Sequence, residues 1–227
     1  ISEPFYVQPK LDGIRLLVSR RGCFSRTGKP VKGVEYLSSG LREGEYLDGE
    51  CYAPDKTFEE ITSIFKTNPK ELEFHIFDYF DLERPELTFE ERMDCINVET
   101  FSVKKKSEVK GYHDMFVSQG YEGIMIRDAK SVYEVGQRSN YLLKYKTFQT
   151  EEYKIIGAKT GHGRDANAVV WVCKTEDDRE FTVRPEGTIS QREEYYRDHV
   201  KYLGKMLTVR FQNLTALNVP RFPVGVV

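Results

Sequence analysis

Runs of apolar residues that alternate with polar ones recur through the first 146 residues of the chain. The runs are rich in aromatic and β-branched side chains and are bounded by Gly, Asp or Pro, a pattern typical of β-strands. Strands are therefore predicted over residues 5–8, 14–19, 45–52, 73–79, 123–127 and 141–146.

Helical patterns separate these strands. The sequence Thr-Phe-Glu-Glu occurs at residues 57–60 and again at 88–91. In this arrangement the Thr and the second Glu cap the first turn of a helix reciprocally. Apolar residues at helical spacing follow both sequences, so each predicts a helix. A third helix is predicted over about 112–119, because Gly120 is a natural residue for the end of a helix.

The pattern changes after residue 150. Four further strands are predicted over residues 153–159, 168–174, 180–184 and 206–212. One helix is expected among them, with Ser190 and Glu193 as its capping box and Gly204 beyond its end. About five strands and one helix in a segment of this length suit an OB-fold barrel. We place a domain boundary near residue 148 and predict the α+β fold class.

Composition places the chain among globular proteins. Hydrophobic residues make up 39% and charged residues 31%, which excludes a disordered polyelectrolyte. No apolar run approaches the roughly 18–20 residues that span a bilayer, and the first residues carry no signal peptide. We therefore expect an intracellular protein without a membrane partner. The chain lacks an initiator Met, so we expect a fragment or a processed chain.

The total charge gives no sign of a nucleic-acid partner. Basic residues number 34 and acidic residues 36, for a net charge of −2, so any site for a polyanion must concentrate its cations along one cleft. The cysteines form no C-x-x-C pair, which argues against a zinc ribbon or a dense disulfide framework. We expect all of them to be reduced, small and buried: Cys23, Cys51, Cys95 and Cys173.

One turn offers a candidate nucleophile. Lys10, Asp12, Gly13 and Arg15 form a K-x-D-G-x-R sequence between two predicted strands. An amine attacks only after it has lost its proton, and a free lysine has a pKa of about 10.4, so nearby cations or a metal would have to favour the neutral form. Taken alone, the same sequence also fits a surface turn with a solvated lysine.

Further residues at strand ends suit a metal-bound nucleotide. Glu50 and Glu122 are carboxylates that can bind Mg²⁺, and Phe77 offers a ring that can stack on a base. Lys144 and Lys146 share one face of a strand, so both can meet the same phosphates. Taken individually, Glu50 also fits a hairpin turn and Phe77 a position in the core. The two lysines also fit the solvated face of a strand. Their ordered combination favours a nucleotide site.

The set, taken in order, resembles the covalent nucleotidyltransferases and, among them, the ATP-dependent DNA ligases. The resemblance covers essentially the whole chain and implies that Lys10 takes AMP from ATP as a phosphoramide. It makes Glu50 the acidic residue of motif III, Phe77 the adenine-stacking ring and Glu122 the metal-binding glutamate. The two lysines of the Lys-Tyr-Lys sequence at 144–146 become contacts to the nucleotide.

Four more residues gain roles from the resemblance alone. Arg26 and Arg138 match arginines that contact the nucleotide or a phosphate, and Gln8 occupies the adenine-reading position. Arg221 corresponds to the arginine that orients the β- and γ-phosphates of ATP.

The resemblance also implies an architecture and an activity. A nucleotidyltransferase (adenylation) domain of antiparallel sheets with flanking helices is expected over 1–148, and an OB-fold domain over 149–227. We expect the second to be incomplete at its C-terminus, because the family's domain continues further. The implied enzyme is a monomer that seals 3′-hydroxyl/5′-phosphate nicks in duplex DNA, with ATP and Mg²⁺ (or Mn²⁺) as cofactors.

Rival interpretations share some of these residues. An RNA ligase would use the same lysine and glutamate motifs, although the Arg-Phe-Pro sequence at 221–223 favours DNA. An mRNA guanylyltransferase would use GTP and usually has Asp in place of Glu122. An NAD-dependent ligase would need a nicotinamide-binding segment and zinc-binding cysteines, which this sequence lacks. From another class, the chain could be an inert nucleic-acid-binding module that uses its barrel.

Overall fold

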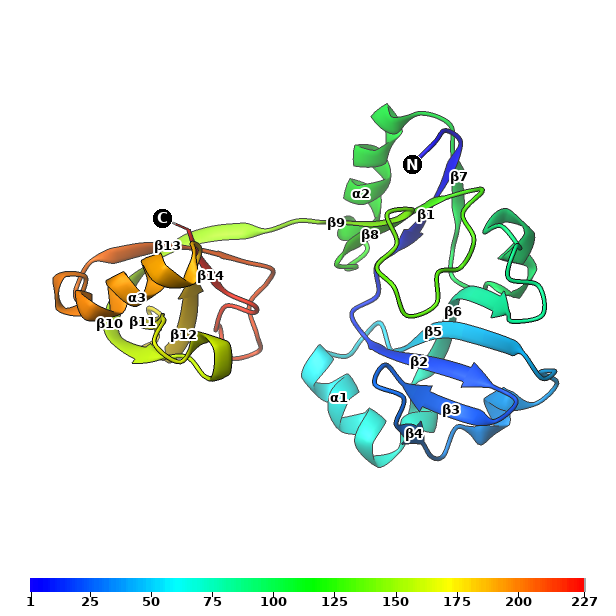
Figure 1. Ribbon diagram of the computed structural model, residues 1–227, viewed down its shortest axis with the longest axis horizontal. Helices are drawn as coiled ribbons and strands as arrows, with labels where there is room; N and C mark the ends of the chain where they lie inside the picture. The colour runs from blue at the N-terminus through cyan, green and yellow to red at the C-terminus, as the bar shows by residue number, and fades with distance from the viewer. Residues whose placement is uncertain (227) are drawn as a thin grey trace. The chain divides into compact units, whose positions relative to one another are not determined.

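The computed structural model of the protein describes residues 1–226. The chain forms two compact units, one over Ile1–Lys146 and one that begins at Thr147, and the elements of each can be followed in Figure 1. The second unit begins two residues before the predicted start of the second domain at 149. Antiparallel sheets with separate helices make up the first unit and a closed barrel the second, which confirms the predicted fold class.

The first unit contains two antiparallel sheets. One has the strand order β7-β1-β8-β9 and consists of β7 (Phe101–Val103), β1 (Phe5–Pro9), β8 (Gly123–Asp128) and β9 (Leu142–Lys146). The other has the order β4-β3-β2-β5-β6 and consists of β4 (Pro30–Val31), β3 (Gly22–Ser25), β2 (Ile14–Ser19), β5 (Glu45–Tyr52) and β6 (Glu73–Asp81). The six strands predicted here are present, whereas β3, β4 and β7 are too short to show an alternating pattern.

Two α-helices belong to this unit. Helix α1 (Phe58–Thr67) begins as predicted, because Thr57 accepts a hydrogen bond from the Glu60 N–H and Glu60 accepts one from the Thr57 N–H. Helix α2 (Val109–Ser118) starts three residues earlier than predicted. Gly120 follows its end with a φ of +93°, a left-handed conformation that glycine adopts without strain.

The second Thr-Phe-Glu-Glu sequence starts a helix, as predicted, but this helix is short and of the 3₁₀ type. The capping hydrogen bonds between Thr88 and Glu91 form, yet the segment is a six-residue 3₁₀ helix, η3 (Glu90–Cys95). Its Arg92 side chain is buried and donates to Asp78 at 2.9 Å. From inside this short helix, Arg92 thus pairs with a residue of β6. The other 3₁₀ helices are η1 (Glu35–Ser38), η2 (Pro69–Glu71), η4 (Lys106–Glu108), η5 (Gly163–Asp165) and η6 (His199–Lys201).

Each sheet of the first unit has its own hydrophobic core. Leu16 of β2 and Ile61 of α1 belong to one cluster, and Val7 of β1 and Phe116 of α2 to another, and all four side chains are fully buried. These cores fix the two sheets whose residues line the site described below. None of the helices in residues 1–226 combines the length and hydrophobicity that crossing a bilayer needs.

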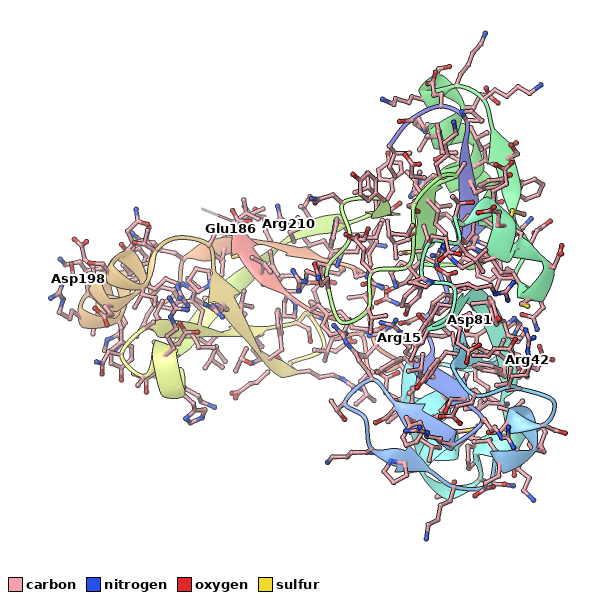
Figure 2. The ribbon with its side chains drawn as sticks, turned by 45° about the vertical axis from the view of Figure 1, so that its right-hand side comes forward. Arg15, Arg42, Asp81, Glu186, Asp198 and Arg210 are labelled. Carbon is pink, nitrogen blue, oxygen red and sulfur yellow. The ribbon has the colours of Figure 1, made fainter. Side chains whose placement is uncertain are left out.

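The second unit is a closed five-stranded barrel with the strand order β10-β11-β12-β14-β13. Its strands are β10 (Gln149–Thr160), β11 (Val169–Lys174), β12 (Glu180–Pro185), β13 (Met206–Phe211) and β14 (Val224–Val226). The predicted OB-fold is thereby confirmed. The sequence pattern does not predict β14, which has three residues and closes the barrel between β12 and β13. Arg210 of β13 donates to Glu186 at 2.5 Å, and Figure 2 labels both side chains.

The barrel helix α3 (Ile189–Arg197) starts at a different residue from the one predicted. Thr188 is the N-cap: its hydroxyl accepts from the Gln191 N–H at 3.2 Å, and Gln191 accepts from the Thr188 N–H. The predicted cap, Ser190, lies inside the helix, so that assignment was wrong. Both sequences have the capping-box form. Thr188, however, directly follows Gly187, which has a left-handed φ of +116° and lies between the end of β12 and the start of the helix.

The cysteines are all free, as predicted, but they are not all buried. Cys23, Cys51 and Cys173 are buried, and burial raises the pKa of the thiols of Cys51 and Cys173 to about 12. Cys95 is exposed, which corrects the prediction. It is the last residue of η3, and the residue that this helix buries is Arg92.

Candidate active site

A cleft of about 390 Å³ is lined by residues from both sheets of the first unit. It brings together seven of the predicted site residues: Gln8, Lys10, Arg15, Arg26, Glu50, Phe77 and Lys144. They come from five strands and from two connecting turns. The fold therefore gathers groups that lie up to 136 positions apart, from Gln8 to Lys144, around one space.

Lys10 stands at the end of β1 and is tied to the start of β8 through the backbone. The Lys10 N–H donates to the Gly123 carbonyl at 2.9 Å, and the Glu122 N–H donates to the Lys10 carbonyl at 3.2 Å. A side chain at Gly123 would meet the Tyr145 carbonyl at 2.2 Å, so this close approach requires glycine. Gly13 is constrained in the same way, because its Cβ would lie 2.3 Å from the Cys51 carbonyl.

Glu122 joins two of the predicted lysines. Its carboxylate forms an ion pair with the Lys10 ammonium through one oxygen and accepts from Lys146 Nζ at 2.9 Å through the other. The Glu122 side chain is only 6% exposed. Burial alone would raise its pKa, but the two lysines outweigh burial and lower it. The ionised carboxylate therefore holds both amines in place beside the cleft.

Glu50 lies opposite Arg15 in the β2–β5 register. Burial raises its pKa to about 7, an effect that Lys10 opposes and Asp48 reinforces. A carboxyl group that ionises near neutral pH, in a cleft with cations, is typical of a functional site.

The pKa of Glu50 predicts a pH-dependent stability. The carboxyl group binds a proton on folding between pH about 4.5 and about 7, so the free energy of unfolding falls as the pH rises through this window. Glu50→Gln cannot ionise and removes this loss, which makes the variant more stable than the native chain at pH 8 by up to about 3 kcal/mol. Denaturant unfolding at pH 5 and pH 8, with EDTA present, measures the difference.

A matched control is Glu86→Gln, which changes an exposed carboxyl group in the same unit. It should leave the difference between the two pH values as in the native chain. An identical pH dependence for Glu50→Gln and the native chain would contradict the assigned pKa.

The carboxamide of Gln8 is held by the protein itself. Its nitrogen donates to the Phe77 carbonyl at 3.2 Å and to Thr100 Oγ1 at 3.1 Å, and its oxygen accepts from Arg127 Nε at 2.7 Å. Gln8 is 1% exposed. In this geometry it fixes the strand that carries Phe77, the ring expected to stack on adenine. Direct reading of adenine by Gln8 stays a prediction, for which the second lone pair of the carboxamide oxygen would serve.

A network of buried charges beside the cleft escaped the sequence-based prediction. Asp78 accepts from Arg92 at 2.9 Å and from Arg127 at 2.7 Å, and all three side chains are at most 6% exposed. Arg127 also lies 5.5 Å from the centre of the Phe77 ring. The available signal was the position of Asp78 and Arg127 inside otherwise apolar strands, where an unpaired charge would be costly.

A second buried carboxylate supports Arg15. Asp48 accepts from Arg15 Nε at 2.7 Å and from Arg15 Nη2 at 2.5 Å, a two-point contact that fixes the plane of the guanidinium group. Arg15 comes from β2 and is labelled in Figure 2. Tyr133 completes the group by donating to Asp48 at 2.6 Å.

Two predicted residues lie elsewhere. Arg138 is not among the cleft-lining residues of the described chain, although its neighbours Gln137 and Ser139 are. Arg221 belongs to the second unit, where its N–H donates to the Asn213 carbonyl at 2.8 Å and its guanidinium lies 4.9 Å from the Phe222 ring centre. Their contacts to a nucleotide stay predictions.

Two antiparallel sheets that line one lysine-bearing cleft, followed by a closed five-stranded barrel, form the architecture of a nucleotidyltransferase with an OB-fold domain. Residues 1–146 match the family described as ATP dependent DNA ligase domain, and residues 160–227 match the DNA ligase OB-like domain. The chain belongs to the ATP-dependent DNA ligase family. This membership agrees with the family resemblance of its motifs and does not favour the RNA ligase and guanylyltransferase interpretations.

Known proteins similar to the chain are themselves DNA ligases. The DNA ligase of African swine fever virus (isolate Pig/Kenya/KEN-50/1950) is 30% identical over 92% of this chain, which spans 59% of the viral protein. The DNA ligase of Haemophilus influenzae is 24% identical over 97% of this chain and 85% of its own length. The chain thus spans about three fifths of the viral relatives that it matches.

Solved structures share the fold. A structure described as a Lig E DNA ligase that binds DNA with a minimal scaffold has a TM-score of 0.81 and 20% identity, covering 98% of this chain and 91% of its own. The Chlorella virus DNA ligase-adenylate has a TM-score of 0.56 and 24% identity, covering 100% and 92%.

Proposed function

We propose that the protein is an ATP-dependent DNA ligase that seals 3′-hydroxyl/5′-phosphate nicks in duplex DNA through an AMP adduct on Lys10. The observation that carries this proposal is the position of Lys10. Its amine lies at the edge of a nucleotide-sized cleft, bound to Glu122, with Lys144, Arg15 and Arg26 lining the same space. An amine surrounded by phosphate-binding cations is suited to attack a phosphoryl group.

In the first step the Lys10 amine, once deprotonated, attacks the α-phosphorus of ATP. The N–P bond forms as the bond between the α-phosphorus and its bridging oxygen breaks, and pyrophosphate leaves. Phe77 stacks on the adenine, and the lysines and Arg15 balance charge on the phosphate oxygens. The protein thus contributes position and electrostatics. Buried carboxylates already fix two of these cations, because Asp48 holds Arg15 and Glu122 holds Lys146.

Two transfers complete the reaction. The 5′-phosphate of the nick attacks the phosphorus of the Lys10 adduct, which releases the lysine and joins AMP to the DNA through a pyrophosphate-type bond. The 3′-hydroxyl then attacks the DNA phosphorus and displaces AMP, which closes the strand. We expect DNA binding to weaken strongly with salt, since phosphate contacts release counterions.

The carboxylates of the site fit Mg²⁺ or Mn²⁺ as a nucleotide-bound ion. Glu50 and Glu122 are hard oxygen donors, and no cluster of three or more potential ligands occurs within residues 1–226. Mg²⁺ typically takes one or two carboxylates and completes its shell with phosphates and water, so Glu50 and Glu122 would hold it. When bound, the ion would stabilise charge on the phosphates.

Covalent labelling tests the proposal. The native chain should gain one AMP mass on incubation with ATP and a divalent cation, but no adduct with GTP or NAD. Absence of any adduct would leave the inert OB-type module as the better interpretation, and a GMP adduct would favour a guanylyltransferase. The adenylated chain should then seal nicked duplex DNA in preference to nicked RNA, whereas the opposite preference would favour an RNA ligase.

A monomeric state and an intracellular site of action stay predictions.

A further inference from the structure

The connection between β8 and β9 forms one wall of the cleft. It is a long loop that leaves the sheet of β8 and extends toward the other sheet of the first unit (Figure 1). The start of the loop is held by the backbone, because the Phe89 N–H donates to the Ser131 carbonyl at 2.8 Å. The wall itself consists of Ser131, Val132, Tyr133, Glu134, Gln137, Ser139 and Tyr141.

Tyr133 ties this wall to the second sheet. Its hydroxyl donates to Asp48 of β5 at 2.6 Å and accepts from Arg15 Nη2 of β2 at 3.0 Å. Its ring stacks on Phe80 of β6, with centroids 4.1 Å apart and planes at 18°. One side chain thus joins a loop of one sheet to three strands of the other. The hydroxyl uses both its donor and its acceptor capacity in doing so.

Two of the residues that Tyr133 contacts line the cleft. Arg15 and Asp48 both line the space, and Asp48 is buried to 1% exposure with two partners, Arg15 and Tyr133. Burial, together with the Asp48 carboxylate, raises the pKa of Tyr133, so its hydroxyl stays a donor at physiological pH. A donor that faces a buried carboxylate makes a stronger hydrogen bond than a neutral pair does.

We propose that Tyr133 is a positioning residue that ties the wall of residues 131–141 to the second sheet and thereby sets the affinity of the cleft for ATP. This inference rests on the proposed function. A wall that is ordered before the nucleotide arrives loses less conformational entropy on binding, so affinity rises. The chemical step depends on Lys10 and the phosphate-binding cations. Tyr133 contacts one of these cations, Arg15, but Asp48 fixes the Arg15 guanidinium through two hydrogen bonds of its own, so the chemical step should not need the Tyr133 hydroxyl.

The test variant is Tyr133→Phe, which retains the ring on Phe80 and removes both hydrogen bonds of the hydroxyl. We expect the KM for ATP in Lys10 adenylation to rise about tenfold, while the adenylation rate at saturating ATP stays within about twofold. Single-turnover labelling over a range of ATP concentrations separates the two quantities. Tyr36→Phe is the matched control, since Tyr36 is 59% exposed on η1 and outside the cleft.

Hydrogen exchange supplies a readout that does not depend on catalysis. Without nucleotide, amides of residues 131–141 should exchange faster in Tyr133→Phe than in the native chain, and saturating ATP should reduce the difference. Unchanged exchange, an unchanged KM, or a fall in the saturating rate without a change in KM each overturns the inference. If the native chain forms no AMP adduct, the proposed function fails instead, and the exchange comparison still decides whether Tyr133 holds the wall.

Discussion

Replacing Lys10 by alanine should abolish covalent labelling of the protein by ATP labelled in the α-phosphate. The adduct needs an amine at the α-phosphorus, and Lys10 provides one at the cleft, held by Glu122. Lys146 is not expected to replace it, because it is not among the cleft-lining residues of the described chain. Gel autoradiography and intact-mass spectrometry both measure the loss, which should reach the detection limit.

Two further variants separate the chemistry of Lys10 from its charge. Lys10→Arg keeps a cation beside Glu122 but lacks a nucleophilic amine, so it should also remain unlabelled. Lys110→Ala removes an exposed lysine of α2 that pairs with Asp114 outside the cleft, and it should label as the native chain does. A Lys10→Ala protein that still gains AMP would show that another residue is the nucleophile.

The sequence predicts the chemistry-bearing positions better than the boundaries of the fold. Lys10 directly follows β1, Glu50 lies near the end of β5 and Phe77 lies in β6, all in or beside strands that the sequence predicts, and the structure brings all three to one cleft. Strands β4 and β14 have only two and three residues, too few for an alternating pattern. They form because longer neighbours offer free edges, which is information about tertiary pairing and not about local sequence.

The buried polar groups could not be predicted for a related reason. Arginine is usually exposed, so Arg92 carries no sequence signal of burial, and the position of Arg127 in an apolar strand does not say which carboxylate it pairs with. Their carboxylate, Asp78, is 14 positions from one and 49 from the other. Only the fold brings the three together. One of the two arginines, Arg127, also donates to the carboxamide of Gln8, which the sequence predicted as an adenine contact.

Asp78→Ala should destabilise the first unit by about 3–5 kcal/mol. Asp78 is the shared carboxylate of Arg92 and Arg127, and its removal leaves two buried guanidinium groups without an opposite charge. Arg127→Met should cost less, because Asp78 and Arg92 remain as a neutral pair. Asp94→Ala, an exposed change in the same unit, should be nearly neutral. The expected order of stability is therefore Asp94→Ala, then Arg127→Met, then Asp78→Ala.

The chain contains an internal reference for this measurement. Trp171 is the single tryptophan and is buried in the core of the second unit. Its fluorescence follows unfolding of the barrel, whereas far-UV circular dichroism follows both units. Asp78→Ala should shift the circular dichroism transition to lower denaturant and leave the Trp171 transition close to its native midpoint. If Arg127→Met proved as damaging as Asp78→Ala, the cost would arise from lost packing or from Gln8, and the uncompensated charge would not be its cause.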